Sequence, residues 1–248
     1  MTGRMKKLRN QGHPAVLAAL LMMLSACATV DPEYADPRDP LESFNRSMFT
    51  FNDNLDQYVA KPLARGYKKI TPEPIDKGIS NFFSNLDDVG SIINNGLQFK
   101  IKDAISDVGR LGVNSTIGLL GLLDVASSMG LPKHYEDFGQ TLGVWGMGPG
   151  PYLVLPVIGP SSGRDTVGFA ADWFTNPLYY VVEDTGVSWG LYILRFVDRR
   201  ADLLKTSELL ESAALDPYAF MRDAYLQRRQ NQVYDGDPPV EDIFGDEP

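Results

Sequence analysis

Apolar side chains recur at helical spacing along most of this chain, and this pattern limits the folds it can adopt more than any other feature. The first apolar face consists of Leu41, Phe44, Met48, Phe51, Leu55 and Tyr58. Spacings of three and four residues place them on one side of a helix. The two continuous apolar runs, 15–24 and 117–123, are shorter than the roughly 20 residues that a membrane-spanning helix needs. The pattern predicts an all-α protein built from amphipathic helices.

Capping residues and prolines suggest where these helices begin and end. Asp39 and Glu42 have the spacing of a capping box, and the helix that they begin is expected to end before Pro62. Asp87 or Asp88 can cap another helix in the same way. The remaining helices are expected over 75–86, 89–97, 101–108 and 193–204, and from Asp216 onward.

Two segments break the helical pattern. Residues 117–123 are all apolar or Gly, so this stretch is expected to be buried, either as a packed core helix or in lipid. Gly118 and Gly121 are unfavourable in a helix, which suggests that another part of the chain approaches the backbone closely there. Residues 138–165 are rich in Gly and Pro and predict compact irregular chain that forms a wall or a constriction, with short extended pieces at 152–154 and 157–158.

The N-terminus has the pattern of a secretory signal peptide over residues 1–26: a basic start, a short apolar block and small residues at its end. The last four positions, LSAC at 24–27, resemble a bacterial lipobox, in which the cysteine becomes a lipidated N-terminus. Cys27 is the only cysteine, so no internal disulfide is possible, and we expect it to be a lipid anchor. An ordinary signal peptide with an incidental cysteine is the alternative. Ala28 lacks the acidic side chain that commonly retains such lipoproteins at the inner membrane, and this indicates the outer membrane.

Charge and composition divide the rest of the chain. Residues 27–38 contain several prolines and charged residues and predict an extended tether, 39–230 a helical domain, and 231–248 an acidic, disordered tail. The net charge of −9 argues against a nucleic-acid partner, which requires a basic face.

One catalytic motif matches literally. Gly159 to Gly163 fits the G-x-S-x-G nucleophile elbow, which makes Ser161 the candidate nucleophile of a lipoprotein esterase or lipase. That fold needs a parallel sheet, and few strands are expected here. Its histidine also follows the serine, whereas His134 precedes Ser161. We therefore favour a turn at this position and expect no enzymatic activity, no metal site and no cofactor.

The chain resembles the MlaA (VacJ) family of outer-membrane lipoproteins. The resemblance covers most of residues 39–229 and rests on several long motifs in the family's order. These motifs are DPLESFNRSMFTFND at 39–53, KPLARGY at 61–67, ISNFFSNL at 79–86, NSTIGLLGLLDVAS at 114–127, FGQTLGVWGMGPGPYLVLPVIGPSSGRD at 138–165 and DPYAFMRDAYLQRR at 216–229.

The resemblance implies a fold and a function. Family members are ring-like assemblies of helices that lie in the periplasmic leaflet of the outer membrane. An amphipathic channel passes phospholipids that have strayed into the outer leaflet to the periplasmic carrier MlaC, and trimeric porins are the usual partners. This retrograde transport maintains lipid asymmetry and makes or breaks no covalent bond.

The resemblance also suggests where a lipid path would run. The candidate residues are Gly118, Gly121, Asp124, Gln140 and Arg164. The glycines would let the backbone approach the channel, and Arg164 would contact a headgroup. A structural salt bridge between Arg164 and Asp165 is the alternative for that arginine.

Overall fold

The computed structural model describes residues 36–239 of the chain. The expected signal peptide (1–26), the lipid anchor Cys27 and the end of the acidic tail (240–248) lie outside the described residues. The described elements are α2 (Glu42–Leu55), the π-helix η2 (Asp56–Ala60), α3 (Lys61–Ile70), α4 (Glu73–Leu97), α5 (Ile101–Thr116), α6 (Val125–Ser128), α7 (Phe138–Val144), β1 (Tyr152–Leu155), β2 (Gly159–Ser162), α8 (Gly163–Thr175), α9 (Leu178–Val181), α10 (Thr185–Asp202), α11 (Leu204–Ala213) and α12 (Pro217–Val233). The prediction of a helical protein is confirmed.

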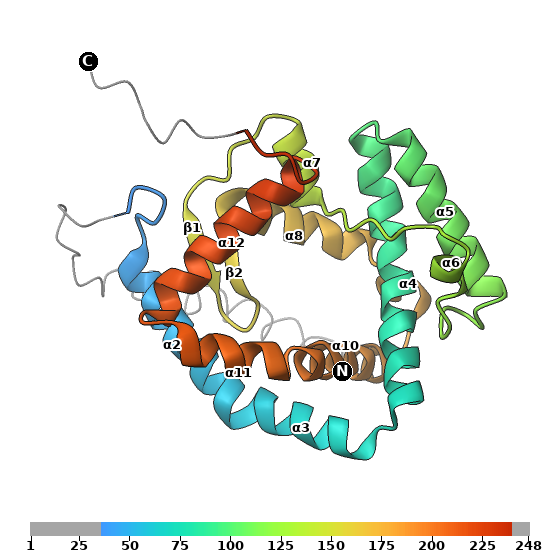
Figure 1. Cartoon of the computed structure of the whole chain (residues 1–248), viewed down its shortest axis with the longest axis horizontal. Helices are drawn as coiled ribbons and strands as arrows, with labels where there is room; N and C mark the ends of the chain where they lie inside the picture. Colours follow the sequence, from blue (N-terminus) through green and yellow to red (C-terminus); the bar gives the residue numbers. More distant parts are fainter. Residues whose placement is uncertain (1–35, 240–248) are drawn as a thin grey trace, which may run out of the picture.

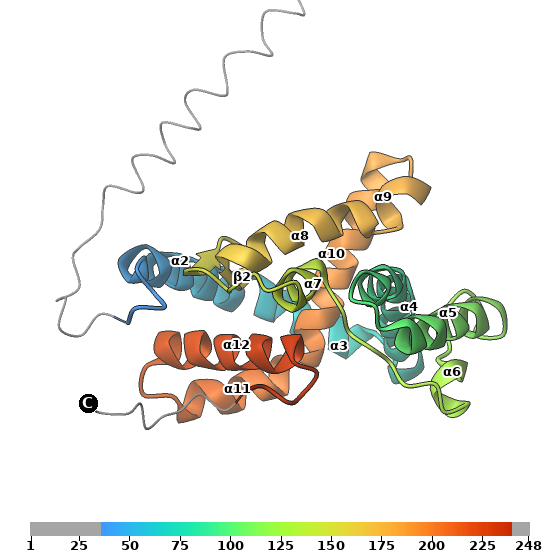
Figure 2. The same ribbon diagram turned by 90° about the horizontal axis from the view of Figure 1, so that it is seen from above.

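The elements are arranged as a ring. Figure 1 shows α3, α4, α8, the β1–β2 hairpin and α12 following one another around the ring, with α5 and α6 outside α4. Viewed from the side in Figure 2, the ring is flat, α10 crosses its thickness, and α9 projects from one face. Within residues 36–239, no helix combines the length and the apolar character needed to cross a bilayer.

The first helix differs from its prediction at both ends. Glu42 begins α2 without a side-chain cap, and Asp39 is instead buried, where it accepts hydrogen bonds from Asn45 Nδ2 at 2.7 Å and from the Tyr218 hydroxyl. The chain also does not end its helical course before Pro62. It passes from α2 through η2 directly into α3, and Pro62, which has no N–H to donate, lies just after the π-helical turn, in the first turn of α3.

One long helix, α4, replaces the two helices expected over 75–97. Neither Asp87 nor Asp88 caps a helix. Asp87 pairs with two arginines of α10, and Asp88 is buried, where it accepts a hydrogen bond from Lys133. The caps were predicted wrongly because acidic residues in the middle of a helix can serve tertiary contacts that no local pattern reveals.

The apolar segment 117–123 is not a packed core helix. It forms a series of turns in which Leu119, Leu120 and Gly121 have φ values of 54°, 59° and 89°. Ile117, Leu119 and Leu120 are all exposed. The prediction of close backbone approach is confirmed, because a Cβ on Gly118 would lie 2.3 Å from the Leu123 carbonyl oxygen and one on Gly121 would lie 2.6 Å from Asn85 Cβ.

The Gly/Pro-rich segment contains the only sheet in the described part of the chain. Strands β1 and β2 pair antiparallel, with Tyr152 opposite Ser162, and Val157 lies in the turn between them rather than in an extended piece. Asn45 of α2 fixes the free edge of β1, because its side chain accepts the Val154 N–H at 2.8 Å and donates to the Tyr152 carbonyl at 2.9 Å. The hairpin thereby joins α2 into the ring.

The helical domain extends beyond its expected limits at both ends. Arg38, within the expected tether, lies 2.9 Å from Asp223 of α12, and Arg222 lies 3.0 Å from Asp36. Helix α12 begins at its predicted cap, Asp216, and continues to Val233. These contacts bring the start of the described chain against its last helix.

Candidate functional site

The exposed surface of the described chain carries many large apolar side chains. Large apolar side chains that are more than half exposed include Tyr58, Ile70, Phe99, Ile105, Leu120 and Val181. They belong to η2, α3, α5, α9 and the connections between helices. Exposed apolar surface on this scale is typical of a protein that contacts lipid or a partner.

The interior has the opposite character. Seven polar residues in the described part of the chain have a relative exposure of 0%: Asn45, Asp88, Asn94, Asn95, Asp107, Thr141 and Ser162. Burying such groups is unfavourable unless they are hydrogen bonded. The pairs here include Asn95 Nδ2 with Asp107 at 2.9 Å and Thr141 Oγ1 with Asn94 at 2.8 Å. Buried polar and charged residues, 21 in the described part of the chain, outnumber the 12 buried apolar ones, while many large apolar side chains are exposed; we call this distribution inverted polarity.

A buried arginine holds the connection between α5 and α7 against the ring. Arg110 of α5 is 2 % exposed and donates hydrogen bonds to the Leu131 carbonyl at 2.5 Å and to Asp124 at 3.2 Å. Burial alone would raise the pKa of Asp124, but hydrogen bonds from Ser127 and Asn114 outweigh it and lower that pKa to about 2. Asp124 is therefore ionised at neutral pH and caps α6.

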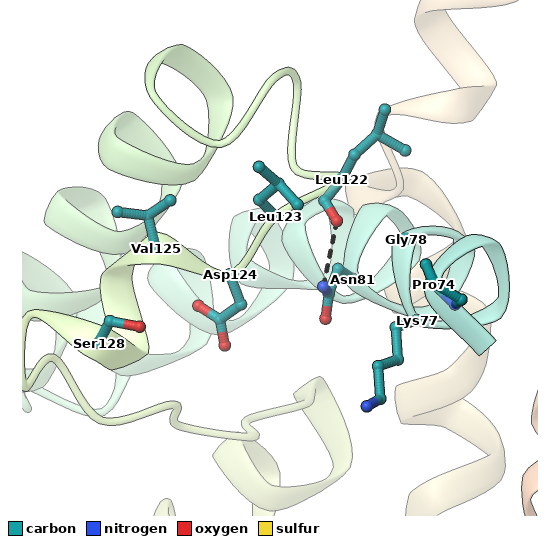
Figure 3. A pocket seen from close by; sticks show the side chains of 9 residues that line it. All are labelled: Pro74, Lys77, Gly78, Asn81, Leu122, Leu123, Asp124, Val125 and Ser128. Carbon is teal, nitrogen blue, oxygen red and sulfur yellow. Dashed lines mark hydrogen bonds between the residues drawn. The ribbon is translucent and has the colours of Figure 1, made fainter.

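An open pocket of about 440 Å³ lies between the first half of α4 and this connection. In Figure 3, Lys77 and Asn81 extend from α4, and Leu123 and Asp124 face them from the connection. The Asn81 amide donates to the Leu122 carbonyl at 3.1 Å, which ties the two sides together. The pocket combines an apolar wall with one cation and one anion.

A second ionic cluster joins three elements on the other side of the ring. Arg229 of α12 donates to Asp137, at the start of α7, at 2.6 and 2.8 Å. It also donates to Asp165 of α8 at 2.9 and 3.0 Å, and the Tyr225 hydroxyl donates to the same carboxylate at 2.6 Å. Because its partners come from distant parts of the sequence, this cluster closes the ring.

Comparison with known proteins decides the family. The family model of MlaA lipoproteins matches residues 37–232, which is most of the chain. The chain belongs to the MlaA lipoprotein family.

Individual relatives agree with this assignment. The chain is 36% identical over 230 residues to the intermembrane phospholipid transport system lipoprotein MlaA of Haemophilus influenzae, covering 89% of this chain and 91% of that protein. The Escherichia coli protein of the same name is 36% identical over 219 residues, with 86% of each chain covered. An uncharacterised Rickettsia prowazekii protein is 38% identical over 196 residues, covering 79% of this chain and 78% of that protein.

A solved structure shares the fold of this MlaA-family chain. It was presented as the structural basis for maintenance of bacterial outer membrane lipid asymmetry. The TM-score is 0.70 at 37% sequence identity, over 79% of this chain and 98% of the solved one. The family's named members are thus transport lipoproteins, and the ring is the family's fold.

The structure divides the five candidate path residues into two groups. Gly118, Gly121 and Asp124 lie together on the connection beside the pocket, and Asp124 lines it. Gln140 and Arg164 lie on α7 and α8 and are 2 % and 7 % exposed.

The polar groups of this second pair are already engaged within the protein. Gln140 Nε2 donates to the Tyr135 carbonyl at 2.9 Å, and Arg164 Nε donates to Asp165 at 3.0 Å. The salt-bridge alternative for Arg164 is therefore the observed arrangement. Both side chains support the wall of the ring.

The residues of the hydrolase alternative do not form a catalytic arrangement. Ser161 lies in β2 of an antiparallel hairpin, is 5 % exposed, and shares a hydrogen bond of 2.9 Å with the Thr166 hydroxyl. His134 forms a hydrogen bond of 2.8 Å with Asp107 of α5. The turn expected at this position is wrong, because Gly159–Ser162 form strand β2, but the expected cap is present, since Ser162 accepts the Asp165 N–H at the start of α8.

Sequence reasoning missed the charged residues that close the ring. Arg229 lies 64 residues from Asp165 and 92 residues from Asp137 in the sequence. The only sequence signal was the motif at 216–229, which identified a helix start but not its partners. Asp172 of α8, which accepts the Phe138 N–H at 3.1 Å, was missed for the same reason.

Asp172 should make the stability of the fold depend on pH near neutrality. Burial raises the pKa of Asp172 to about 6, and the nearby charge of Asp137 adds to the effect. Because this exceeds the ordinary value of 3.8, the folded state binds the proton more tightly than the unfolded state. The free energy of unfolding should therefore rise as pH falls from 7 towards 5.

Denaturant unfolding at pH 5, 6, 7 and 8 checks this expectation, with Asp172→Asn as the matched variant. The Asn side chain can still accept the Phe138 N–H but cannot titrate. The variant should be the more stable protein at pH 8. Its free energy of unfolding should rise less than that of the unchanged protein as pH falls from 7 towards 5. Identical pH profiles for the two proteins would contradict the assignment.

Proposed function

We propose that this chain removes misplaced phospholipids from the outer leaflet of the outer membrane and passes them through the ring to a periplasmic carrier. The family assignment supports phospholipid transport as the general role. The observation that carries the proposal is the inverted polarity of the ring, with exposed apolar side chains outside and buried polar groups inside. Transport requires no covalent chemistry.

The physics of a lipid path explains why this arrangement is suitable. A phospholipid that crosses a membrane protein needs polar groups for its headgroup and an apolar route for its acyl chains. Amphipathic helices too short to span a bilayer lie in one leaflet, with their apolar faces in lipid. Irregular backbone at that depth is tolerated only where protein covers it or where it lines a cavity. The turns at 117–123 meet this condition on their inner side, because Gly118 and Gly121 pack closely against neighbouring backbone and Asn85.

The proposal also places the chain in the cell envelope. Acyl chains on Cys27 would anchor it in the periplasmic leaflet of the outer membrane, since several chains together give stable anchoring. By the resemblance to its family, a trimeric porin would be its outer-membrane partner and MlaC its carrier. The path would pass Gly118, Gly121 and Asp124, while Gln140 and Arg164 hold the wall.

Deleting the gene and restoring it tests the function. Cells without the chain should accumulate phospholipid in the outer leaflet, measured as substrate for an externally added phospholipase, and the intact chain should return this to the original level. An unchanged outer leaflet in the deleted cells would overturn the proposal.

A Ser161→Ala variant separates transport from the esterase alternative. The variant should restore lipid asymmetry fully, because the serine hydroxyl makes structural hydrogen bonds where β2 meets α8, to the Ser162 carbonyl and the Thr166 hydroxyl. A variant that stays folded and anchored yet fails to restore asymmetry would instead support hydrolysis. Measuring lysophospholipid and free fatty acid in the same cells identifies that outcome directly.

A further inference from the structure

Two arginines of α10 share one carboxylate of α4. Arg195 NH2 lies 2.5 Å from Asp87 Oδ1, and Arg199 NH2 lies 2.9 Å from Asp87 Oδ2. Each carboxylate oxygen is thus engaged by a different guanidinium. A second carboxylate, Asp198, also acts on the charge of Arg199, but its own hydrogen bonds come from Tyr67 and Ser80.

The two arginines differ in how they are held. Arg195 is 15% exposed, and its guanidinium also lies over the ring of the buried Phe83, 5.8 Å from the ring centre. Arg199 is 61% exposed, so most of its guanidinium edge is accessible. The cluster therefore consists of one fixed cation and one cation with hydrogen-bond donors to spare.

The surroundings of Arg199 weaken its hydration although the side chain stays accessible. Its pKa is lowered, first because the surrounding protein reduces its hydration and second because Arg195 lies close by. Helix α10 crosses the thickness of the ring, and it packs against α4 (Figures 1 and 2).

The face of α10 that carries the two arginines also carries an aromatic side chain, which packs against α8. Tyr192 precedes Arg195 by three residues and Arg199 by seven, so the three side chains share one helix face. Tyr192 stacks on Trp173 of α8, with ring centres 5.3 Å apart. At a rise of 1.5 Å per residue, the aromatic pair and Arg199 are separated by about 10 Å along the helix. This face thus joins a cationic end to an apolar end.

We propose that Arg195 and Arg199 form a phosphate-binding subsite where α10 meets α4, which holds the phosphate of a phospholipid headgroup while the aromatic pair contacts its apolar part. The inference rests on the proposed function and adds the headgroup contact. Guanidinium groups suit phosphate because their N–H donors form a planar fork that matches two phosphate oxygens.

Lipid binding by the purified protein tests the subsite. The full lipidated chain in non-ionic detergent is titrated with fluorescent phosphatidylglycerol, and Arg199→Gln is compared with Arg65→Gln. Arg65 is a matched control, since it is 59% exposed and pairs with Glu208. Arg199→Gln should weaken binding about ten-fold, the effect expected for hydrogen bonds to a charged group. Arg65→Gln should bind as the unchanged chain does.

Asp87→Asn should act in the opposite direction. Removing the carboxylate leaves both guanidiniums free for the phosphate, so the affinity should rise several-fold. If Asp87 and Arg199 only stabilised the contact between α4 and α10, both variants would weaken binding together with the melting temperature, and that result would overturn the subsite.

Two further probes identify the source of the phosphate. A fluorescent diacylglycerol, which has no phosphate, should bind equally to the unchanged chain and to Arg199→Gln. Inorganic phosphate at millimolar concentration should displace phosphatidylglycerol only weakly, because it lacks the apolar part. Strong displacement would instead indicate a site for free phosphate and overturn the lipid assignment.

The failure of the subsite can be distinguished from failure of the proposed function. If the unchanged chain binds no phospholipid, the transport proposal itself fails. If it binds phospholipid and Arg199→Gln binds equally well, only the subsite is wrong.

Discussion

Replacing Arg229 with methionine should lower the free energy of unfolding by about 3–5 kcal/mol, the cost typical of removing one partner from a buried ionic cluster. Arg229 is 10% exposed as a side chain and is the cation that joins Asp137 to Asp165. Methionine fills a similar volume but leaves two carboxylates without this partner. Because the three residues belong to α12, α7 and α8, the loss should also loosen the closure of the ring.

The same substitution should change the response to acid. Burial would raise the pKa of Asp165, but Arg229 and the Tyr225 hydroxyl outweigh it and lower that pKa to about 2. The pKa of Asp137 is lowered for the same reason, chiefly by Arg229 against the effect of burial. A lowered pKa gives stability that is complete above the ordinary value of 3.8 and is lost as pH falls through about 2. In Arg229→Met the two carboxylates have no arginine partner at any pH. The free energy of unfolding of this variant should therefore fall less between pH 4 and 2 than that of the unchanged protein.

Denaturant unfolding in detergent at pH 7 and between pH 4 and 2 measures both effects. Arg228→Met is the matched control, since Arg228 is the neighbouring arginine on α12 and is exposed. Its stability should change by less than about 0.5 kcal/mol, as for most surface substitutions. A loss for Arg229→Met as small as that of the control would contradict the role of Arg229 in closing the ring.

Replacing Gly168 with alanine should destabilise the protein even though alanine is the better helix former. A Cβ on Gly168 of α8 would lie 2.4 Å from the Gly139 backbone nitrogen and 2.6 Å from its Cα, both in α7. Backbone atoms cannot move aside as a flexible side chain can, so the two helices must separate. Overpacking of this kind costs about 1–3 kcal/mol, which exceeds the gain of up to about 1 kcal/mol from helix propensity.

Gly112→Ala provides the matched control with the opposite sign. Gly112 also lies inside a helix, α5, but an added Cβ meets nothing within 4 Å. This variant should be as stable as the unchanged protein or more stable by up to about 1 kcal/mol. Thermal unfolding of both variants measures the difference, and a stabilised Gly168→Ala would show that α7 and α8 do not cross as closely as described.

Much of the local structure could be predicted because it depends on residues that are close in sequence. The spacing of apolar residues predicted the helices over 101–108, 193–204 and from Asp216. The irregular chain predicted over 138–165 from its Gly and Pro was largely wrong, because α7, β1, β2 and the start of α8 lie there. The predicted helix caps failed where a tertiary contact engages the capping side chain instead. Asp39 and Asp87 have the spacing of helix caps, but a buried Tyr218 and the arginines of α10 engage them instead.

The candidate site was predictable only in part. The glycines of 117–123 were recognised because a helix disfavours them, and the structure shows the close contacts that require them. Gln140 and Arg164 were identified from their polarity, but polarity does not reveal whether a side chain is already paired within the fold. Asp137, Asp172 and the pair Arg195 and Arg199 carried no local signal.

The sequence by itself therefore determined the helical class, the positions of most helices, the Gly-dependent turns and the family, because periodicity, backbone preference and motifs are local properties. The closure of the ring and the direction in which its polar and apolar surfaces face were decided only by the tertiary structure. An amphipathic helix has the same spacing whether its apolar face packs inward or outward. Which face is buried depends on partners such as Arg229 with Asp137 and Asp165, which are far apart in the sequence and meet only when the ring closes.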